Sequence, residues 1–298
     1  MQRLQGLPDT AALADDQYHV YALCYAHNGN RRVHDAFLMP QDLHDGPMPI
    51  DYSIWIVENR HRRFIVDLGF DPASAQRRNR KLAHHPVEAL ERIGVQCDEV
   101  SDIVITHLHC DHAGNMERFS NATIHVQDAE VAFVASRCMC EDHLRFPYEL
   151  DHVLNVMRKN FAKQLAFHDG DGPLFPGVTL HKLAGHTAGL QGVRVNTPRG
   201  PVLLASDATH YFPNAFNLKP HPITLDVASM IASYRTIMSL VPGPEFVIPG
   251  HDPKVRDIYP KLVVSGIVLH ALHEAPRVTE AGYFKSVANY LPEYPLDT

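Results

Sequence analysis

Short runs of apolar and β-branched residues recur along the chain, and polar or turn-forming residues separate them. Runs of this kind predict strands that are buried on one or both faces. Two of them, 53–57 and 63–67, flank the polar turn 58–62 and predict a β-hairpin. Further strands are expected at 18–25, 101–106, 122–126, 178–183, 201–206, 245–248 and 266–272.

Segments with apolar residues at helical spacing predict helices at three places. The helix at 85–93 is expected to begin near Pro86, because proline suits the first helical turn. The helix at 128–136 is expected to be capped by Asp128. The helix at 225–240 has an apolar face that should pack on a sheet.

Metal-binding types of side chain gather where one of the strands ends. The strand 101–106 runs directly into the sequence His-Leu-His-Cys-Asp-His at 107–112. Imidazole nitrogen and carboxylate oxygen suit zinc and similar divalent ions. Because so many ligands leave one short loop in different directions, this spacing serves two adjacent metals better than one. Cys110 is expected to pack rather than to bind metal.

Three later strands end in the same kind of residue, since His186, Asp207 and His251 follow the strands 178–183, 201–206 and 245–248. A glycine precedes each of these two histidines, where the backbone must turn sharply or approach something closely. If the strands lie side by side, the candidate ligands converge on one rim of the fold. These ligands are His107, His109, Asp111, His112, His186, Asp207 and His251.

The order and spacing of these residues resemble the metallo-β-lactamase superfamily over 53–252. The resemblance implies an α/β fold, a four-layer αββα sandwich with a dinuclear metal site at one edge. It also implies two divalent metal ions, with Zn²⁺ expected. By position, the first metal would be held by His107, His109 and His186, the second by Asp111, His112 and His251, and Asp207 would bridge them.

The segment 65–69 matches an early strand of the same family. Asp67 in this segment would then orient a ligand imidazole. Alternatively, Asp67 is a turn residue before Gly69. Both interpretations remain open at the level of sequence.

Three segments, 48–57, 206–211 and 247–253, narrow the resemblance to the N-acyl homoserine lactonase group. That group places a tyrosine three residues after the bridging aspartate. Here His210 takes this position and Tyr211 follows it, so either residue could reach the substrate. The resemblance implies a hydrolase that opens a small lactone, an acyl homoserine lactone of the quorum-sensing type or a related one, by attack of a metal-bound hydroxide. Asp111 is expected to carry a proton, and Tyr211 or His210 to stabilise the oxyanion.

Other functions on the same scaffold remain open. They include hydrolysis of a thioester, a β-lactam or a phosphodiester, and a di-iron redox activity. Redox members typically carry glutamate where this chain has His109, which favours hydrolysis. A binding protein with a vestigial site is disfavoured, because every expected ligand is present.

Composition and the spread of the candidate ligands limit the possible partners and the number of domains. The chain has 298 residues, is 45% hydrophobic and carries a formal net charge of -7. Since the ligands spread from 107 to 251 without a linker, we expect a single domain over 1–298, with an N-terminal extension at 1–17. Segments 27–51 and 138–171 are candidates for the substrate wall, and 138–171 is a candidate lid over the metals.

The acidic balance argues against nucleic acid as a partner, and no apolar stretch approaches the length of a membrane span. An odd count of five cysteines without a signal peptide predicts reduced thiols and a cytoplasmic protein. The expected partner is a small-molecule lactone or ester. A homodimer is a candidate assembly.

Overall fold

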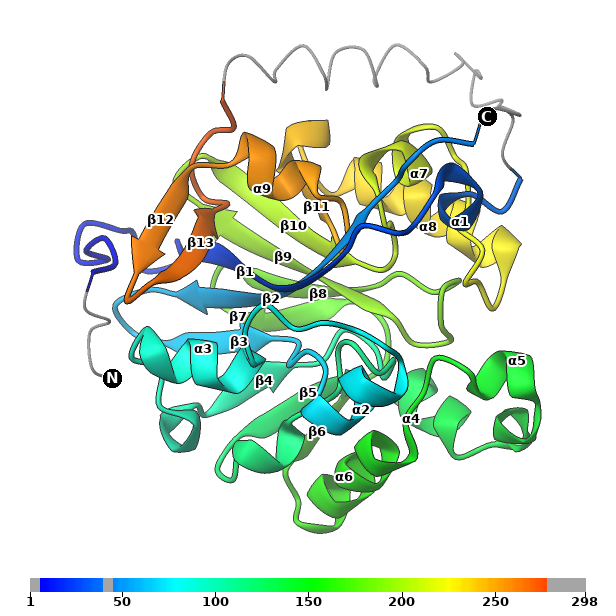
Figure 1. The fold of residues 1–298 in the computed structure, drawn as a ribbon. Coiled ribbons are helices and arrows are strands. Elements are labelled where there is room, and N and C mark those ends of the chain that lie inside the picture. The colour runs from blue at the N-terminus through cyan, green and yellow to red at the C-terminus, as the bar shows by residue number, and fades with distance from the viewer. Residues whose placement is uncertain (1–5, 40–44, 278–298) are drawn as a thin grey trace.

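Two stacked β-sheets form the centre of the molecule (Figure 1). The computed structural model describes residues 6–39 and 45–277. Within these residues the larger sheet has eight strands in the order β12-β13-β1-β2-β3-β4-β5-β6, and the smaller has five in the order β11-β10-β9-β8-β7. The larger sheet contains β1 (His19–Asn28), β2 (Ile50–Glu58), β3 (Arg63–Val66), β4 (Asp102–Val104), β5 (Thr123–Gln127), β6 (Leu165–His168), β12 (Lys261–Val264) and β13 (Ile267–Ala271). The smaller sheet contains β7 (Gly172–Phe175), β8 (Val178–Lys182), β9 (Gln191–Thr197), β10 (Gly200–Ser206) and β11 (Val247–Pro249).

Strand β1 shows why the predicted strands read as nearly continuous apolar runs. Its Tyr21 and Leu23 belong to the core between the larger sheet and the outer helices. Its Val20 and Ala22 belong to the core between the two sheets. Because successive side chains of a strand point to opposite faces, a strand buried on both faces needs apolar residues at almost every position.

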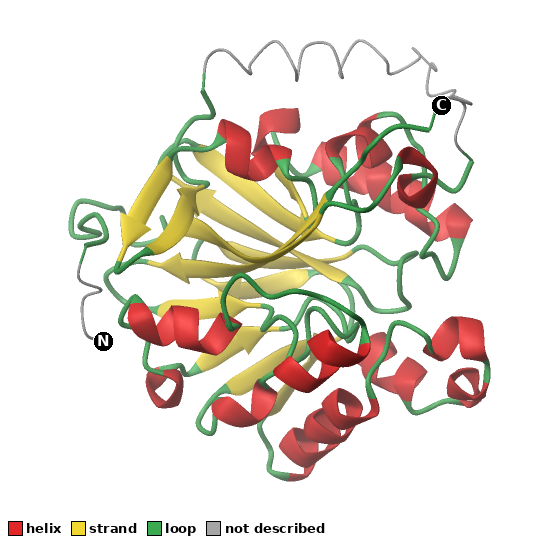
Figure 2. Cartoon of the chain, viewed as in Figure 1, coloured by secondary structure: helices red, strands yellow, loops and turns green. Residues whose placement is uncertain are grey.

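Helices cover the outer faces of both sheets and complete a four-layer sandwich (Figure 2). On the larger sheet, Val87 and Val156 from two of these helices enter the outer core. On the smaller sheet, Phe212 and Tyr234 enter the other core. The expected αββα architecture is therefore confirmed. The helices are α1 (Val33–Ala36), α2 (Pro72–Arg77), α3 (Pro86–Arg92), α4 (Asp128–Val134), α5 (Asp142–Arg145), α6 (Leu150–Phe161), α7 (Phe212–Phe216), α8 (Val227–Ser239) and α9 (Lys254–Ile258).

Most predicted elements are present with shifted ends, and two details were wrong. Asp128 is the first residue of α4 rather than its cap, because Gln127 takes the cap position without a side-chain hydrogen bond. Asp128 still places a carboxylate in the first turn, where it interacts favourably with the helix dipole. The strand expected at 245–248 begins only at Val247, after a 3₁₀ turn over Pro244–Phe246. Strands β6, β7, β9 and β12 and the helices α1, α2, α5, α6, α7 and α9 were not predicted.

Five strands deliver the candidate ligand loops to one place. Strands β3 and β4 are parallel neighbours, and so are β10 and β11. Chain segments that leave parallel neighbours in the same direction meet at the same edge of a sheet. Asp67 follows β3, the 107–112 loop follows β4, and His186, Asp207 and His251 come after β8, β10 and β11.

The two segments proposed as substrate wall differ in their structure. The 138–171 segment contains α5, α6 and β6, and β6 is the edge strand of the larger sheet. Its residues 143, 144 and 146–148 border a cavity beside the candidate ligands, so the lid stays a prediction for this part alone. The 27–51 segment contributes Arg31 and Ile50 to a second cavity. Residues 40–44 of this segment and 1–5 of the N-terminal extension lie outside the described residues.

No helix in the described part of the chain has the length and apolar character needed to cross a bilayer.

Candidate metal centre

The loop at 107–112 is fixed by carboxylates that the strands and helices bring to it. Asp67 accepts hydrogen bonds from the backbone nitrogen and the hydroxyl of Thr106, at 2.7 and 2.8 Å. Glu130 in α4 accepts one from the backbone nitrogen of Leu108, at 2.9 Å. Glu130 also accepts from the Thr187 hydroxyl at 2.7 Å, beside His186. One buried glutamate therefore ties the two ligand loops together.

Two glycines permit close approach at the candidate ligands. A Cβ atom on Gly250 would lie 2.4 Å from Oδ1 of Asp207. Gly185 has a φ of +131°, and a Cβ there would lie 2.3 Å from the backbone nitrogen of Met230. Side chains do not fit at these distances, so glycine is required before both His186 and His251.

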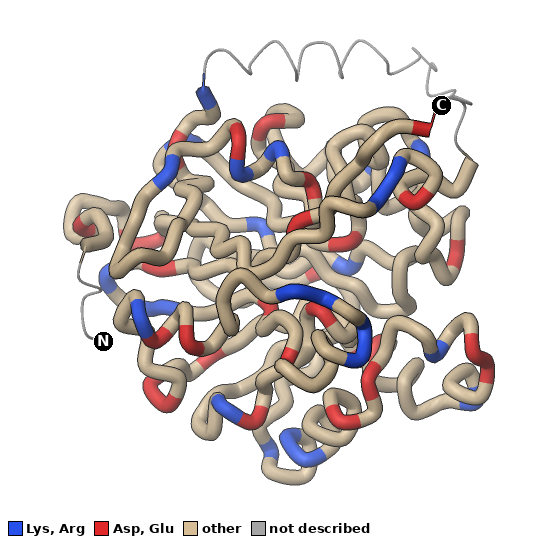
Figure 3. Tube along the Cα trace, in the orientation of Figure 1, with Lys and Arg blue, Asp and Glu red and all other residues tan. Residues whose placement is uncertain are grey.

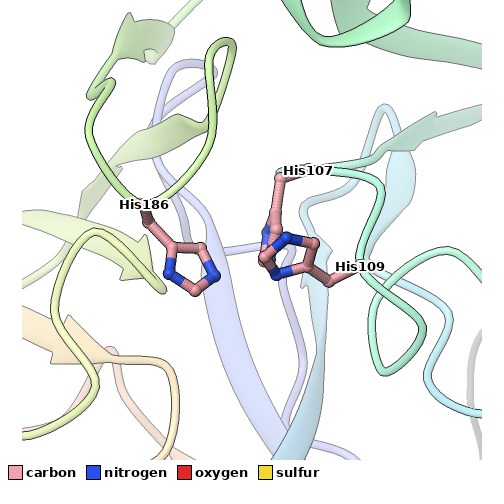
Figure 4. A group of neighbouring side chains, drawn as sticks. All are labelled: His107, His109 and His186. Carbon is pink, nitrogen blue, oxygen red and sulfur yellow. The ribbon is translucent and has the colours of Figure 1, made fainter. Parts of the chain in front are cut away.

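The predicted ligands come together in two groups of side chains. In each group the candidate ligand atoms lie within 4.8 Å of one another. The first group is His107, His109 and His186, whose rings converge from two separate loops (Figure 4). The second group is Asp111, His112, Asp207 and His251.

Asp207, a member of the second group, also lies close to the first. Its Oδ2 is 3.4 Å from Nε2 of His186 and 4.0 Å from Nε2 of His107, both in the first group. The same oxygen is 2.9 Å from Nε2 of His251, and Oδ1 is 3.3 Å from Nε2 of His112. A carboxylate in this position can reach an ion in either group.

Three of the candidate ligand imidazoles are held by a partner on the Nδ1 atom. Nδ1 of His112 lies 2.7 Å from Oδ2 of Asp67. Nδ1 of His186 donates to the backbone oxygen of Ile223, and Nδ1 of His251 donates to that of Asp51, each at 2.7 Å. These partners fix the tautomer, so that Nε2 is left as the metal-binding atom.

The atoms that face the centre are buried and unsatisfied by the protein. Nε2 of His107, His112 and His186 and Oδ1 of Asp207 have no hydrogen-bond partner among the described residues. Unpaired buried polar atoms are costly unless something else binds them. Nitrogen and carboxylate donors in two adjacent groups fit two divalent ions such as zinc.

The protonation states of the first group fit metal binding, whereas in the second group the neighbouring carboxylates outweigh burial and raise the pKa of His112 and His251. Burial lowers the pKa of His107 and His109 well below the usual histidine value, and it lowers the pKa of His186 to about 3. These three imidazoles are therefore neutral at pH 7, which is the form that binds a metal. Burial would raise the pKa of Asp207, but the imidazoles of His251 and His112 lower it well below its usual range. Asp207 is thus ionised.

His210 and Tyr211, the two candidates for substrate contact, have different surroundings. Nε2 of His210 lies 2.9 Å from Oδ2 of Asp207, and His210 borders the cavity at the centre. The Tyr211 hydroxyl is 3.2 Å from both the Met48 and the Pro49 carbonyl oxygens, and Tyr211 is not among the residues that line that cavity. His210 is therefore the residue of the pair that borders both the candidate ligands and the cavity.

His221 is a neighbour of the centre that sequence analysis missed. Its ring stacks on that of His210, with centroids 3.5 Å apart, and its Nε2 contacts the Asp207 backbone oxygen at 3.1 Å. His186, His210 and His221 form a third group of candidate ligand atoms. No strand or motif marked His221, since it lies in an irregular connection before α8. Cys110 is buried beside Asp111 and belongs to none of the three groups.

Two cavities that share lining residues border the centre. The smaller, of about 70 Å³, is bordered by Asp111, Asp207, His210 and His251 and also by Tyr52 and three arginines. The larger, of about 340 Å³, is lined mainly by apolar side chains. His109 and His186 border both cavities, so the ligand groups lie where the two meet.

Comparison with known proteins gives a family match over most of this region. The family profile described as the Metallo-beta-lactamase superfamily matches residues 48–251. An N-acyl homoserine lactonase of Bacillus sp is 30% identical over 171 residues, which cover 56% of this chain and 61% of that protein. The N-acyl homoserine lactonase AiiB of Agrobacterium fabrum is 32% identical over 135 residues, covering 43% of this chain and 49% of that protein. The chain thus matches less than two thirds of the length of either relative.

Solved structures show the same fold at lower sequence identity. The crystal structure of a quorum-quenching N-acyl homoserine lactone lactonase superposes with a TM-score of 0.66 at 23% identity, covering 79% of this chain and 92% of that one. AidC, a dizinc quorum-quenching lactonase in complex with a product, superposes with a TM-score of 0.62 at 17% identity, covering 84% of this chain and 92% of that one. At these identities the likeness concerns the fold.

Proposed function

The chain belongs to the metallo-beta-lactamase superfamily, and from that premise we propose that it is a dinuclear-metal hydrolase that opens a small lactone. The observation that carries this proposal is the pair of buried ligand groups with Asp207 between them. The names of the N-acyl homoserine lactonase relatives support a lactone as the substrate.

The first metal would be held by His107, His109 and His186, and the second by Asp111, His112 and His251, with Asp207 bridging. Two divalent ions in these groups would supply a Lewis acid for the substrate carbonyl and would bring the pKa of a bound water toward neutrality. Both roles suit attack of water on an ester carbon.

Asp111 is the residue we propose for proton transfer. Its Oδ2 lies 3.5 Å from Nε2 of both His112 and His251, and its side chain is 14% exposed toward the cavity. A carboxylate at the cavity wall can accept the proton of the attacking water and pass it to the leaving oxygen. In a lactone that oxygen stays tethered to the product, which keeps it within reach of Asp111.

His210 is the residue we propose for contact with the developing oxyanion. It borders the cavity beside Asp207, whereas the Tyr211 hydroxyl is engaged with backbone carbonyls. An imidazole N–H aimed at the carbonyl oxygen would stabilise charge that develops in the transition state. Tyr211 would then hold the wall of the cavity.

A hydrolysis panel tests the proposal. Zinc-replete protein is assayed by pH-stat on lactones, thioesters, β-lactams and phosphodiesters, with the Asp207→Ala variant as the inactive control. We expect acid release from lactones at neutral pH and two metal ions per chain by elemental analysis. Turnover of a thioester or phosphodiester without turnover of any lactone would overturn the proposed substrate, and one metal or none would overturn the dinuclear site.

A further inference from the structure

We propose that Arg31, Arg80 and Tyr52 form a subsite for an oxyanionic group of the substrate, a carboxylate or a phosphate, beside the metal centre. We call these three residues the basic lobe. The inference rests on the proposed function and gives it a substrate class, an anionic lactone or ester. It differs from the neutral acyl homoserine lactones named for the relatives.

The basic lobe has positive charge that the protein does not neutralise. Arg31, Arg78 and Arg80 all border the small cavity at the metal centre. Arg78 is neutralised, since its Nε lies 2.8 Å from Glu149. In the described part of the chain, neither Arg31 nor Arg80 makes an ion pair with a carboxylate. The basic stretches that carry them, 31–32 and 77–81, stand out along the chain trace (Figure 3).

The remaining contacts of the two arginines leave donors free for a ligand. Arg80 donates through Nη1 to the backbone oxygen of Arg78, at 3.1 Å. Arg31 donates through Nη2 to the backbone oxygen of Asp35, while its buried Nε has no partner. A buried guanidinium nitrogen without an acceptor is costly, and a bound oxyanion would satisfy it.

Tyr52 places this charge next to the metal centre. Its ring centroid lies 5.1 Å from that of the candidate ligand His251. Tyr52, Arg31 and Arg80 line the same small cavity as Asp111 and His251 of the second ligand group. The two guanidinium groups therefore lie on the side of the second ligand group.

Backbone pairing holds the two arginine segments in place. Leu82 forms a bridge with Ala26, which fixes the loop after α2 against strand β1. Arg32 forms a bridge with Pro47, which fixes the segment before α1. The charges are thus carried by restrained backbone, so a bound anion need not order the loops first.

The charge balance of the site favours an anion here. With two divalent cations in the ligand groups, the two guanidinium groups would add to a positive charge that Asp111 and Asp207 offset only in part. A guanidinium matches the geometry of carboxylate and phosphate oxygens through paired hydrogen bonds. The cavity of about 70 Å³ has room for such a group but not for a long alkyl chain.

The larger cavity has the opposite character and would take the rest of the substrate. It is lined by Phe133, Leu144, Phe146, Tyr148, Ile223 and Leu225. Because His109 and His186 border both cavities, the scissile carbonyl would lie between an anionic end in the basic lobe and an apolar end in the larger cavity.

Three γ-lactones that share one ring and one linker test the inference. They end in a primary amide, a carboxylate or a phosphate monoester. For the wild-type protein, kcat/KM should be about tenfold or more higher for the carboxylate or the phosphate lactone than for the amide, and the better of the two identifies the oxyanion. The variants Arg31→Gln and Arg80→Gln should each lose about tenfold on the anionic lactone, mainly in KM, and less than twofold on the amide.

A matched control and a binding measurement separate this inference from the proposed function. Arg235→Gln, on the exposed side of α8, should leave all three values unchanged. In calorimetry, succinate or inorganic phosphate should bind Arg80→Gln about tenfold more weakly than wild type. If no lactone is hydrolysed but this difference persists, the proposed reaction fails and the basic lobe stands. If the amide lactone is hydrolysed as well as the anionic ones, or the arginine variants affect all three equally, the basic lobe is wrong and the reaction stands.

Discussion

Replacing Asp67 by asparagine should weaken the second metal site more than the first. Asp67 is fully buried, and its carboxylate accepts from the backbone nitrogen and hydroxyl of Thr106 and contacts Nδ1 of His112 at 2.7 Å. Asparagine is the right probe for a local reason. The φ of Asp67 is +61°, a conformation that asparagine also tolerates, so the backbone is not strained by the change.

The magnitude follows from the three groups that face the carboxylate. An asparagine side chain has one oxygen and one NH₂ group, so at least one of these three groups would meet a donor instead of an acceptor. Loss of a hydrogen bond to a charged group costs about 1.5–3 kcal/mol, and loss of a partner that orients a metal-binding imidazole typically costs about 10- to 100-fold in metal affinity. We therefore expect the affinity for the second metal to fall by about 10- to 100-fold, and that for the first to fall less, since Asp67 reaches His107 only through the Thr106 hydroxyl.

Chelator competition in metal titrations measures both affinities, and thermal melting of the metal-free protein shows whether the fold itself has changed. Asp102→Asn is the matched control. Asp102 also contacts a histidine, with its Oδ1 3.0 Å from Nε2 of His125, but this pair is not part of a candidate metal group. Equal affinities for the second metal in Asp67→Asn and Asp102→Asn would refute the idea that Asp67 orients His112, and Asp67 would return to being a turn residue.

Three further outcomes test the centre. Asp207→Ala should lose most turnover and part of the metal, because two cations would then face each other, whereas Cys110→Ala should keep both. Elemental analysis and a pH-stat assay measure the two quantities. Near wild-type values for Asp207→Ala would contradict the bridging role. His210→Ala should lower kcat about tenfold or more, which corresponds to about 1.4 kcal/mol of transition-state stabilisation. Tyr211→Phe should keep kcat within threefold and lower the free energy of unfolding by about 1 kcal/mol. The reverse pattern would assign substrate contact to the tyrosine. Glu130→Gln should lower the free energy of unfolding by about 1–3 kcal/mol in urea, because the carboxylate holds both ligand loops, and an unchanged midpoint would contradict that role.

The ligand groups could be predicted because their information is local. Each candidate ligand follows a strand that reads as a short apolar run, and the 107–112 loop holds four of the seven. Strand period and chain order then place the ends of such strands at one edge of a sheet. The sandwich itself was expected from the family resemblance, and strands buried on both faces agree with it, because helices or a second sheet must cover them.

The side chains that fix those ligands could not be predicted, because their partners are distant in the sequence. Glu130 reads as an ordinary acidic residue in the first turn of α4, yet it bonds to Leu108 and Thr187. Glu130 is fully buried in the structure, and a buried glutamate normally has partners. The sequence does not show that this glutamate is buried, so its partners could not be expected. Strands β6 and β7 were missed for a related reason, as their side chains are only partly buried and show no clean alternation.

The choice between His210 and Tyr211 lay beyond sequence for a different reason. The two residues are adjacent and follow Asp207 in an irregular turn, where no period fixes which side chain faces the cavity. The structure separates them through long-range contacts, because Tyr211 reaches the 48–49 backbone while His210 stacks on His221. Arg31 and Arg80 could not be paired from sequence either, because each segment is positioned by a β-bridge to a third part of the chain. Ligands that follow strands can therefore be predicted from a sequence. The residues that determine substrate preference depend on the long-range contacts of the connecting loops.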